Sequence, residues 1–201
     1  DDTIYFTDAT EHAAFIDELL ELRDTGRLLA YDRETGETSV ELPGLGFANG
    51  IAPGPDGDSL LVTETSRYRI RRYWHRGDRA GEDEVIASNL PGFPDNIDAS
   101  ADASTDSYWV AIPTHRDAAL DRIHEFPGLI RQLGKLPSAV LDVAATGSYG
   151  LLLRVSAEGE IVESLHDPTG RVFGITSATP HEGALYLGTL FGERVVRYPL
   201  A

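Results

Sequence analysis

The sequence contains no cysteine, no methionine and a single lysine, Lys135, among its 201 residues. The lack of cysteine excludes disulfide bonds, cysteine nucleophiles and thiolate metal sites. Because translation begins with methionine, we expect a chain without it to be processed or to be part of a longer protein. No apolar run approaches the roughly 20 residues of a transmembrane helix. The N-terminus also lacks the basic and apolar regions of a signal peptide, which favours a cytoplasmic location.

Basic residues are scarce relative to acidic ones. The chain has 17 Lys and Arg residues against 33 Asp and Glu residues, a formal net charge of −16. This balance argues against nucleic acid and anionic membranes as partners, because binding phosphate requires a basic face. An acidic, lysine-poor surface fits a halophile, although a GC-rich genome with an ordinary acidic surface gives the same composition. The hydrophobic content of 41% is enough for a core.

An internal repeat is the dominant pattern that is present. Each repeat begins with a short apolar run ending at a turn, at 47–52, 94–99 and 174–178. A β-rich second strand follows, at 59–64, 107–112 and 184–189. An arginine-containing third strand comes next, at 68–74, 149–155 and 193–198, and two repeats add a fourth, at 84–87 and 160–164. A partial repeat precedes these, with second to fourth strands at 3–7, 26–31 and 38–42.

Units of about 40–50 residues with four strands are typical of β-propeller blades. Asn49 and Asn96, at equivalent places in two repeats, are 47 positions apart. The repeats amount to about four blades, which predicts either a four-bladed ring or the C-terminal part of a longer propeller, and the missing methionine favours the second. Helical spacing of apolar residues predicts two insertions, Glu11–Arg23 and Ala118–Leu133, with Thr10 a candidate cap of the first.

Several strings carry a resemblance to a known family. They are FANGIA at 47–52, YRIRRYW at 68–74, LPGFPDNI at 90–97, SLHDPTG at 164–170 and ALYLGTLFGERVVRYPL at 184–200. Together they resemble the strictosidine synthase-like branch, which includes adipocyte plasma membrane-associated proteins, of the SMP-30/gluconolactonase/paraoxonase superfamily. The resemblance covers nearly the whole chain. It implies an all-β, six-bladed β-propeller of which residues 1–201, as a single domain, supply roughly the last four blades.

Asn49 and the pair Asp95-Asn96 begin the first strand of adjacent repeats, and in a propeller that strand lines the central channel. Their carboxylate and amide oxygens suit a hard cation such as Ca²⁺, and a channel aspartate is costly unless it is paired or metal-bound. The alternative is that Asn-Gly and Asp-Asn are turn formers that repeat. The resemblance implies that Asn49 and Asp95 are metal ligands, with Asn96 a third candidate, and that a further glutamate ligand lies outside this chain.

Asp8, in the string YFTDAT, is a weaker candidate. It is placed either as a further metal ligand or substrate contact, or as a cap for the helical insertion that follows it. The histidines at strand ends, His75, His115, His166 and His181, are more typical of solvated surface positions than of proton-transfer groups.

These features predict a metal-dependent hydrolase of esters or lactones acting on a small molecule, with a Ca²⁺-type ion polarising the carbonyl and Asp95 a candidate base or nucleophile. A non-enzymatic binding scaffold is one alternative. Amine–aldehyde condensation of the strictosidine synthase type is less expected. The resemblance places its essential glutamate just before the EHDG-like turn, where Phe173–Thr179 contains no carboxylate. Motifs of serine hydrolases, P-loop enzymes, zinc proteases and dinucleotide-binding proteins are absent from the sequence.

Overall fold

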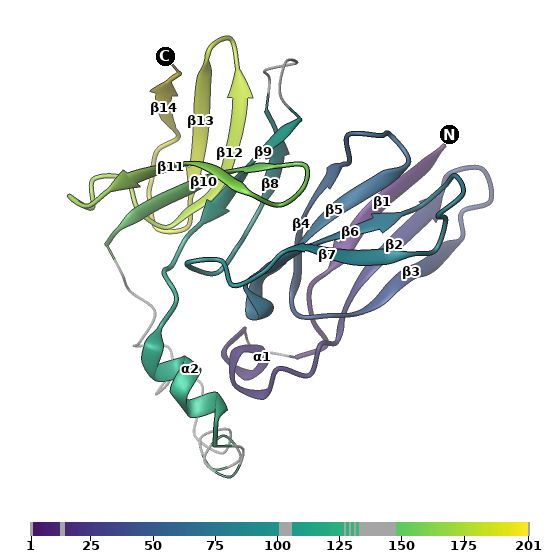
Figure 1. The fold of residues 1–201 in the computed structure, drawn as a ribbon, viewed down its shortest axis with the longest axis horizontal. Helices are drawn as coiled ribbons and strands as arrows, with labels where there is room; N and C mark the ends of the chain where they lie inside the picture. Colours follow the sequence, from purple (N-terminus) through teal and green to yellow (C-terminus); the bar gives the residue numbers. More distant parts are fainter. Residues whose placement is uncertain are drawn as a thin grey trace.

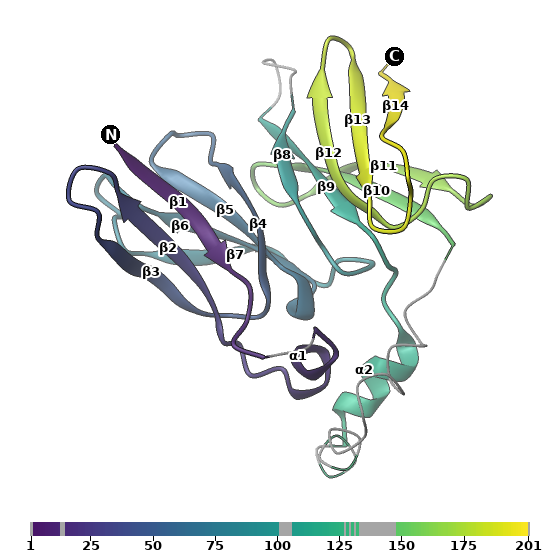
Figure 2. The same ribbon diagram turned by 180° about the vertical axis from the view of Figure 1, so that it is seen from behind.

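The computed structural model of this chain describes residues 2–12, 15–100, 106–126, 128, 130, 132 and 148–200. Within this part, the strands form four antiparallel sheets that follow one another in chain order (Figure 1, and from behind in Figure 2). Each sheet is a meander, because every strand pairs with its neighbour in sequence. The predicted arrangement of propeller blades is therefore confirmed.

The strand bounds follow the predicted repeats closely. The first sheet contains β1 (Thr3–Asp8), β2 (Gly26–Asp32) and β3 (Thr38–Leu45). The second contains β4 (Ala48–Pro53), β5 (Ser59–Glu64), β6 (Arg69–Trp74) and β7 (Asp83–Ala87). The third contains β8 (Ile97–Ala99), β9 (Ser107–Ile112), β10 (Gly150–Ser156) and β11 (Ile161–Asp167), and the fourth β12 (Ile175–His181), β13 (Ala184–Thr189) and β14 (Val196–Pro199).

Three hydrophobic clusters fill the spaces between successive sheets. All six residues of β5 are buried, and so are all six of β9. Successive side chains of a strand point to opposite faces, so one strand can serve two cores. In β5, Leu61 packs toward the third sheet while Val62 packs toward the first. In β9, Val110 packs toward the second sheet and Trp109 toward the fourth. The central strands therefore hold neighbouring blades together.

Two helices interrupt the sheets at equivalent places. Helix α1 (Phe15–Glu21) lies between β1 and β2, and α2 (Ala118–His124) lies between β9 and β10. A short 3-10 helix, η1 (Thr65–Arg67), occupies the same connection in the second sheet. Helices α1 and α2 lie at the lower end of the molecule in Figure 1. We call the connections at this end of the sheets, formed by residues 9–12, 15–25, 65–68 and 113–126, the loop face. Both helical insertions were predicted.

Helix α1 is shorter than the predicted Glu11–Arg23, whereas residues 128, 130 and 132 are helical beyond the end of α2, within the predicted Ala118–Leu133. Helix α1 ends at Glu21 because Leu22 and then Asp24 adopt positive φ angles of 47° and 53°, which a helix cannot continue through. Helix α2 begins at Ala118 because the Asp117 side chain accepts hydrogen bonds from two backbone N–H groups of the first turn, at 2.7 and 3.0 Å. Part of the predicted Ala118–Leu133 insertion lies outside the described residues.

Candidate metal centre

The structure brings the three predicted metal ligands together. Asn49 lies on β4, and Asp95 and Asn96 lie in the segment just before β8, so they come from adjacent sheets. The Asn49 side chain hydrogen-bonds to the Asp95 carboxylate. Asn96 Nδ2 lies 3.2 Å from Asp95 Oδ1. Residues 46 positions apart in the sequence thus form one cluster of side-chain oxygens and amides.

The fourth sheet also reaches this cluster, through Asn96. Its backbone N–H and its side-chain Nδ2 both donate to the carbonyl oxygen of Thr176, at 3.2 and 2.8 Å. Thr176 is the second residue of β12, the first strand of the fourth sheet. The second, third and fourth sheets therefore meet at the cluster, beside the ends of β5 and β9 that lead into the loop face.

The backbone of segment 94–97 does not follow the path of a single regular strand. The Asp95 N–H donates to Ala111 O at 2.9 Å within its own sheet, whereas the Asn96 N–H donates to the fourth sheet. Pro94 has no N–H to donate. Because successive residues bond to different sheets, β8 begins only at Ile97 rather than at the predicted position 94. The two polar side chains are thereby placed at the junction of the blades.

Asp95 is the electrostatic centre of the cluster. Burial raises the pKa of its carboxyl from the ordinary 3.8 to about 6, while hydrogen bonds from the Asn49 side chain and the Asn96 backbone oppose that rise. No cationic side chain of the described residues contributes to this shift. A partly buried carboxylate surrounded by amide groups suits a hard cation, which supplies the missing positive charge through oxygen ligands. The donor set therefore fits a Ca²⁺-type ion.

Asp8 lies in a different environment. Its carboxylate accepts hydrogen bonds from the Arg27 guanidinium on β2, with Nε at 3.1 Å. It is the last residue of β1, as Glu64 is of β5, and Glu64 is likewise held by an arginine of the next strand, Arg69. The structure therefore places Asp8 in a repeated acid–arginine pair. Its role as a ligand or substrate contact stays a prediction.

Sequence reasoning missed the threonines that support the cluster. Thr7 and Thr63 occupy the same position in the aligned strings TIYFTD and SLLVTE. Thr7 Oγ1 donates to the carbonyl oxygen of Asn49 at 2.6 Å, and Thr63 Oγ1 donates to that of Asp95 at 2.5 Å. Each threonine thus holds the candidate ligand that begins the next sheet. An alignment of the second strands of the repeats with one another would have revealed these two threonines.

Asp98 is a second carboxylate that the sequence did not single out. It is the second residue of β8, two positions after Asn96. Thr179 of β12 donates to it through Oγ1 at 3.3 Å, and burial raises the pKa of the Asp98 carboxyl. Asp98 therefore extends the acidic lining along the junction of the third and fourth sheets.

The histidines at strand ends have varied surroundings. His115 lies against the ring of Tyr149, with centroids 4.4 Å apart, and burial lowers its pKa, with a smaller contribution from His166. Tyr149 Oη lies 3.0 Å from Nδ1 of the exposed His166. His181 is exposed in the β12–β13 hairpin beside Glu182. His166 and His181 therefore occupy solvated positions as predicted, whereas His75 and His115 are partly buried.

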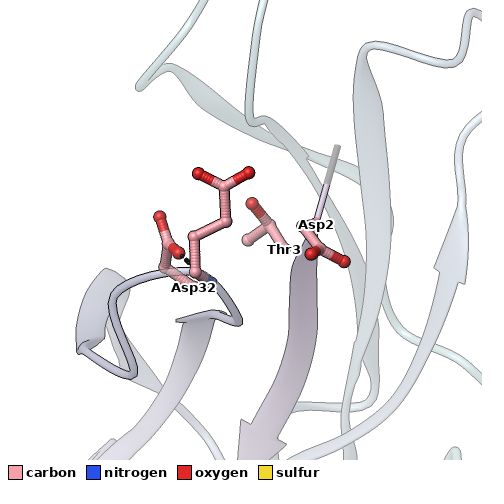
Figure 3. A pocket seen from close by; sticks show the side chains of 4 residues that line it. Asp2, Thr3 and Asp32 are labelled. Atoms are coloured by element: carbon pink, nitrogen blue, oxygen red, sulfur yellow. Dashed lines mark hydrogen bonds between the residues drawn. The ribbon is translucent and has the colours of Figure 1, made fainter.

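A shallow pocket of about 600 Å³ lies away from this cluster, at the opposite end of the first sheet (Figure 3). It is lined by Asp2, Thr3, Asp32 and Glu34. The Asp2 carboxylate is paired with Arg33, and Asp32 Oδ1 accepts the backbone N–H groups of Glu34 and Thr35. The Asp2 and Asp32 carboxylates are therefore engaged within the first sheet and its turn.

Two features that the described residues lack bear on the chemistry. No helix there has the length and apolar character needed to cross a bilayer. Nor do three or more His, Asp or Glu side chains gather in the described part as a metal-binding group. A metal at the Asp95 cluster would therefore depend on the amide oxygens of Asn49 and Asn96.

Comparison with known sequences gives consistent matches. The family model described as strictosidine synthase matches residues 1–78. The adipocyte plasma membrane-associated protein of Bos taurus is 40% identical over 205 residues, covering 98% of this chain and 49% of its own length. The Arabidopsis thaliana protein STRICTOSIDINE SYNTHASE-LIKE 3 is 31% identical over 205 residues, covering 98% and 52%. The chain spans about half the length of the curated relatives it matches.

Comparison with solved structures shows the same fold. A gluconolactonase from Xanthomonas campestris matches with a TM-score of 0.60 and 13% identity, covering 99% of this chain and 54% of that one. Regucalcin from Agrobacterium tumefaciens, described as a calcium-binding protein, matches with a TM-score of 0.57 and 13% identity, covering 96% and 52%. The fold is therefore the β-propeller predicted from the repeats. On its sequence matches and its fold, this chain belongs to the strictosidine synthase-like branch that includes the adipocyte plasma membrane-associated proteins.

Proposed function

We propose that the complete protein is a metal-dependent hydrolase of esters or lactones, with a Ca²⁺-type ion held by Asn49, Asp95 and Asn96. The observation that carries the proposal is the Asp95 carboxyl, which is partly buried between two amide side chains and has no cationic partner among the described residues. A gluconolactonase and a calcium-binding regucalcin share the fold, which supports this choice of chemistry.

The chemistry assigns a role to each group. A bound Ca²⁺-type ion would supply a Lewis acid that polarises an ester or lactone carbonyl and stabilises the oxyanion. Asn49 and Asn96 would bind through their side-chain oxygens, and Asp95 would supply the negative charge. Asp95 must be ionised to act as a ligand, or alternatively as a base, so both roles require a pH above about 6. The helices of the loop face, α1 and α2, lie where they would shape the substrate entrance.

The fourth sheet supports hydrolysis over amine–aldehyde condensation. Its first strand, β12, brings the backbone of Thr176 against Asn96 and carries no carboxylate over its seven residues, ITSATPH. A condensation that needs a carboxylate at this strand as acid and base would lack it. We therefore expect no product when the protein is given tryptamine and an aldehyde.

The test uses the protein expressed from its complete gene, with Ca²⁺ present, and a panel of lactones and aryl esters. Asn49→Ala and Asp95→Ala should each abolish turnover, and Asp32→Asn, at the opposite end of the first sheet, should leave it unchanged. Turnover that survives both cluster substitutions would overturn the assignment. A Ca²⁺-dependent rise in melting temperature without turnover of any substrate would favour a non-enzymatic scaffold instead.

A further inference from the structure

Thr65, the first residue of η1, makes two hydrogen bonds that meet at the candidate metal centre. Its side chain is buried, at 3% exposure. Its Oγ1 lies 2.6 Å from the carbonyl oxygen of Pro94, the residue before Asp95, and 3.1 Å from Nδ2 of Asn49. One hydroxyl therefore touches both chain segments that carry the candidate ligands.

The donor and acceptor inventory fixes the direction of both bonds. A hydroxyl has a single proton, and a backbone carbonyl can only accept, so Thr65 uses its proton on Pro94 O. Toward Asn49 the same oxygen can then only accept. The Asn49 amide must present its NH₂ group to Thr65, and its carbonyl oxygen Oδ1 must face the other way. The hydrogen-bond partners of Thr65 therefore fix the orientation of the Asn49 amide.

The backbone around Thr65 keeps the hydroxyl in place. The Thr65 N–H donates to Phe47 O at 3.1 Å, and the Ser66 N–H donates to Gly46 O at 3.2 Å. Both acceptors belong to the segment that leads into Asn49. Ser66 Oγ in turn donates to the fully buried Glu18 of α1, at 3.1 Å. The helix insertion of the loop face is thus linked to the residue that orients Asn49.

We propose that Thr65 is a positioning residue that holds the Asn49 amide with Oδ1 free to bind the cation. This rests on the proposed metal site. Without the hydroxyl, the only acceptor left among the described residues for the Asn49 NH₂ group is the Asp95 carboxylate, which would itself be a ligand of the cation, so Oδ1 is held less firmly toward the site. Partners behind a metal ligand typically change metal affinity about 10- to 100-fold when they are removed.

The first experiment measures Ca²⁺ affinity by titration calorimetry on the complete protein. Thr65→Val should weaken binding about 10-fold or more, whereas Thr65→Ser, which keeps the hydroxyl, should stay within about threefold of the wild type. In an Asn49→Ala background, Thr65→Val should lose most of its effect, because the amide it orients is gone. Equal losses in both backgrounds would overturn the proposal. Ser59→Ala, which removes a buried hydroxyl from the far end of β5, should leave affinity unchanged.

The second experiment needs no metal and separates this proposal from the proposed function. Side-chain NMR signals of Asn49 should show the Nδ2 proton that is bonded to Thr65 protected from exchange in the wild type and in Thr65→Ser, with the protection of this proton lost in Thr65→Val. Protected protons in a protein that does not bind Ca²⁺ would uphold the positioning role while overturning the metal site. Rapid exchange of the Asn49 amide in the wild type would overturn the positioning role whether or not Ca²⁺ binds.

Discussion

Replacing Asp95 with asparagine should stabilise the metal-free protein at neutral and alkaline pH. Asparagine has nearly the same shape as aspartate but no charge. Because the Asp95 carboxyl is partly buried without a cationic partner among the described residues, its ionisation opposes folding. The substitution removes that cost. A site that binds a cation would thus be a source of instability when the cation is absent.

The pKa gives the sign and the size of the effect. The folded protein holds the Asp95 proton more tightly than the unfolded chain, because its pKa is about 6 against an ordinary 3.8. The associated stability is fully present below about pH 4 and is lost as the pH rises through 6. At 1.36 kcal/mol per pH unit this difference corresponds to about 3 kcal/mol. Asp95 keeps some contact with solvent, so we expect Asp95→Asn to gain about 1–3 kcal/mol at pH 8.

Urea denaturation with a chelator, at several pH values between 4 and 8, provides the measurement. The free energy of unfolding of Asp95→Asn should equal that of the wild type near pH 4 and exceed it increasingly up to about pH 7. Added Ca²⁺ should reverse the order at pH 8, because only the wild type keeps the charged ligand. The full comparison uses differences between variants, so that other titrating groups cancel.

Asp167 offers a control of opposite sign. Its carboxylate accepts hydrogen bonds from the Thr169 hydroxyl at 2.6 Å and from the backbone N–H groups of Val172 and Thr169 at 2.8 and 2.9 Å, and these bonds lower its pKa. Its stabilising effect is present above the ordinary pKa and is lost as the pH falls, so Asp167→Asn should be less stable than the wild type at pH 8.

A metal-free Asp95→Asn protein that is less stable than the wild type at pH 8, or whose difference does not vary with pH, would refute the reasoning.

Three further predictions follow from named contacts. Thr63→Val removes the hydroxyl that donates to Asp95 O and accepts from the Gly50 N–H, so unfolding by urea should show a loss of about 1–3 kcal/mol, mostly restored by Thr63→Ser. Glu64→Gln breaks a fully buried carboxylate held by two arginines and should cost about 3–5 kcal/mol in the same assay, whereas Asp8→Asn in the half-exposed equivalent pair should cost less than about 1 kcal/mol. His124→Ala removes the contact of 2.7 Å between the His124 side chain of α2 and the Leu19 carbonyl oxygen of α1. Amide hydrogen exchange across α1 should then accelerate with little change in global stability. Unchanged exchange would show that the helices are held by other contacts.

The blades were predictable from the sequence because their pattern is local and repeated. The second strands at 59–64, 107–112 and 184–189 have the predicted bounds, since continuous apolar or β-branched runs between turns leave few alternatives. Equivalent positions within the repeats also predicted that Asn49, Asp95 and Asn96 would lie together. The cluster is confirmed as a contact, and its metal stays a prediction. The ends of α1 and β8 were less predictable, because positive φ angles and bonds to a second sheet decide them.

The sequence by itself determined the fold, the number of blades and the residues that meet at the Asp95 cluster, because side-chain periodicity and repetition are properties of the chain. Only the tertiary structure decided how those residues are held. Thr65 lies 16 positions from Asn49 and 29 from Pro94, yet its hydroxyl oxygen accepts from the amide of the first and its proton is donated to the carbonyl oxygen of the second. The raised pKa of Asp95 likewise depends on which sheets exclude water around it. Hydrogen-bond direction and desolvation arise from groups brought together in space, and no local pattern in the sequence encodes them.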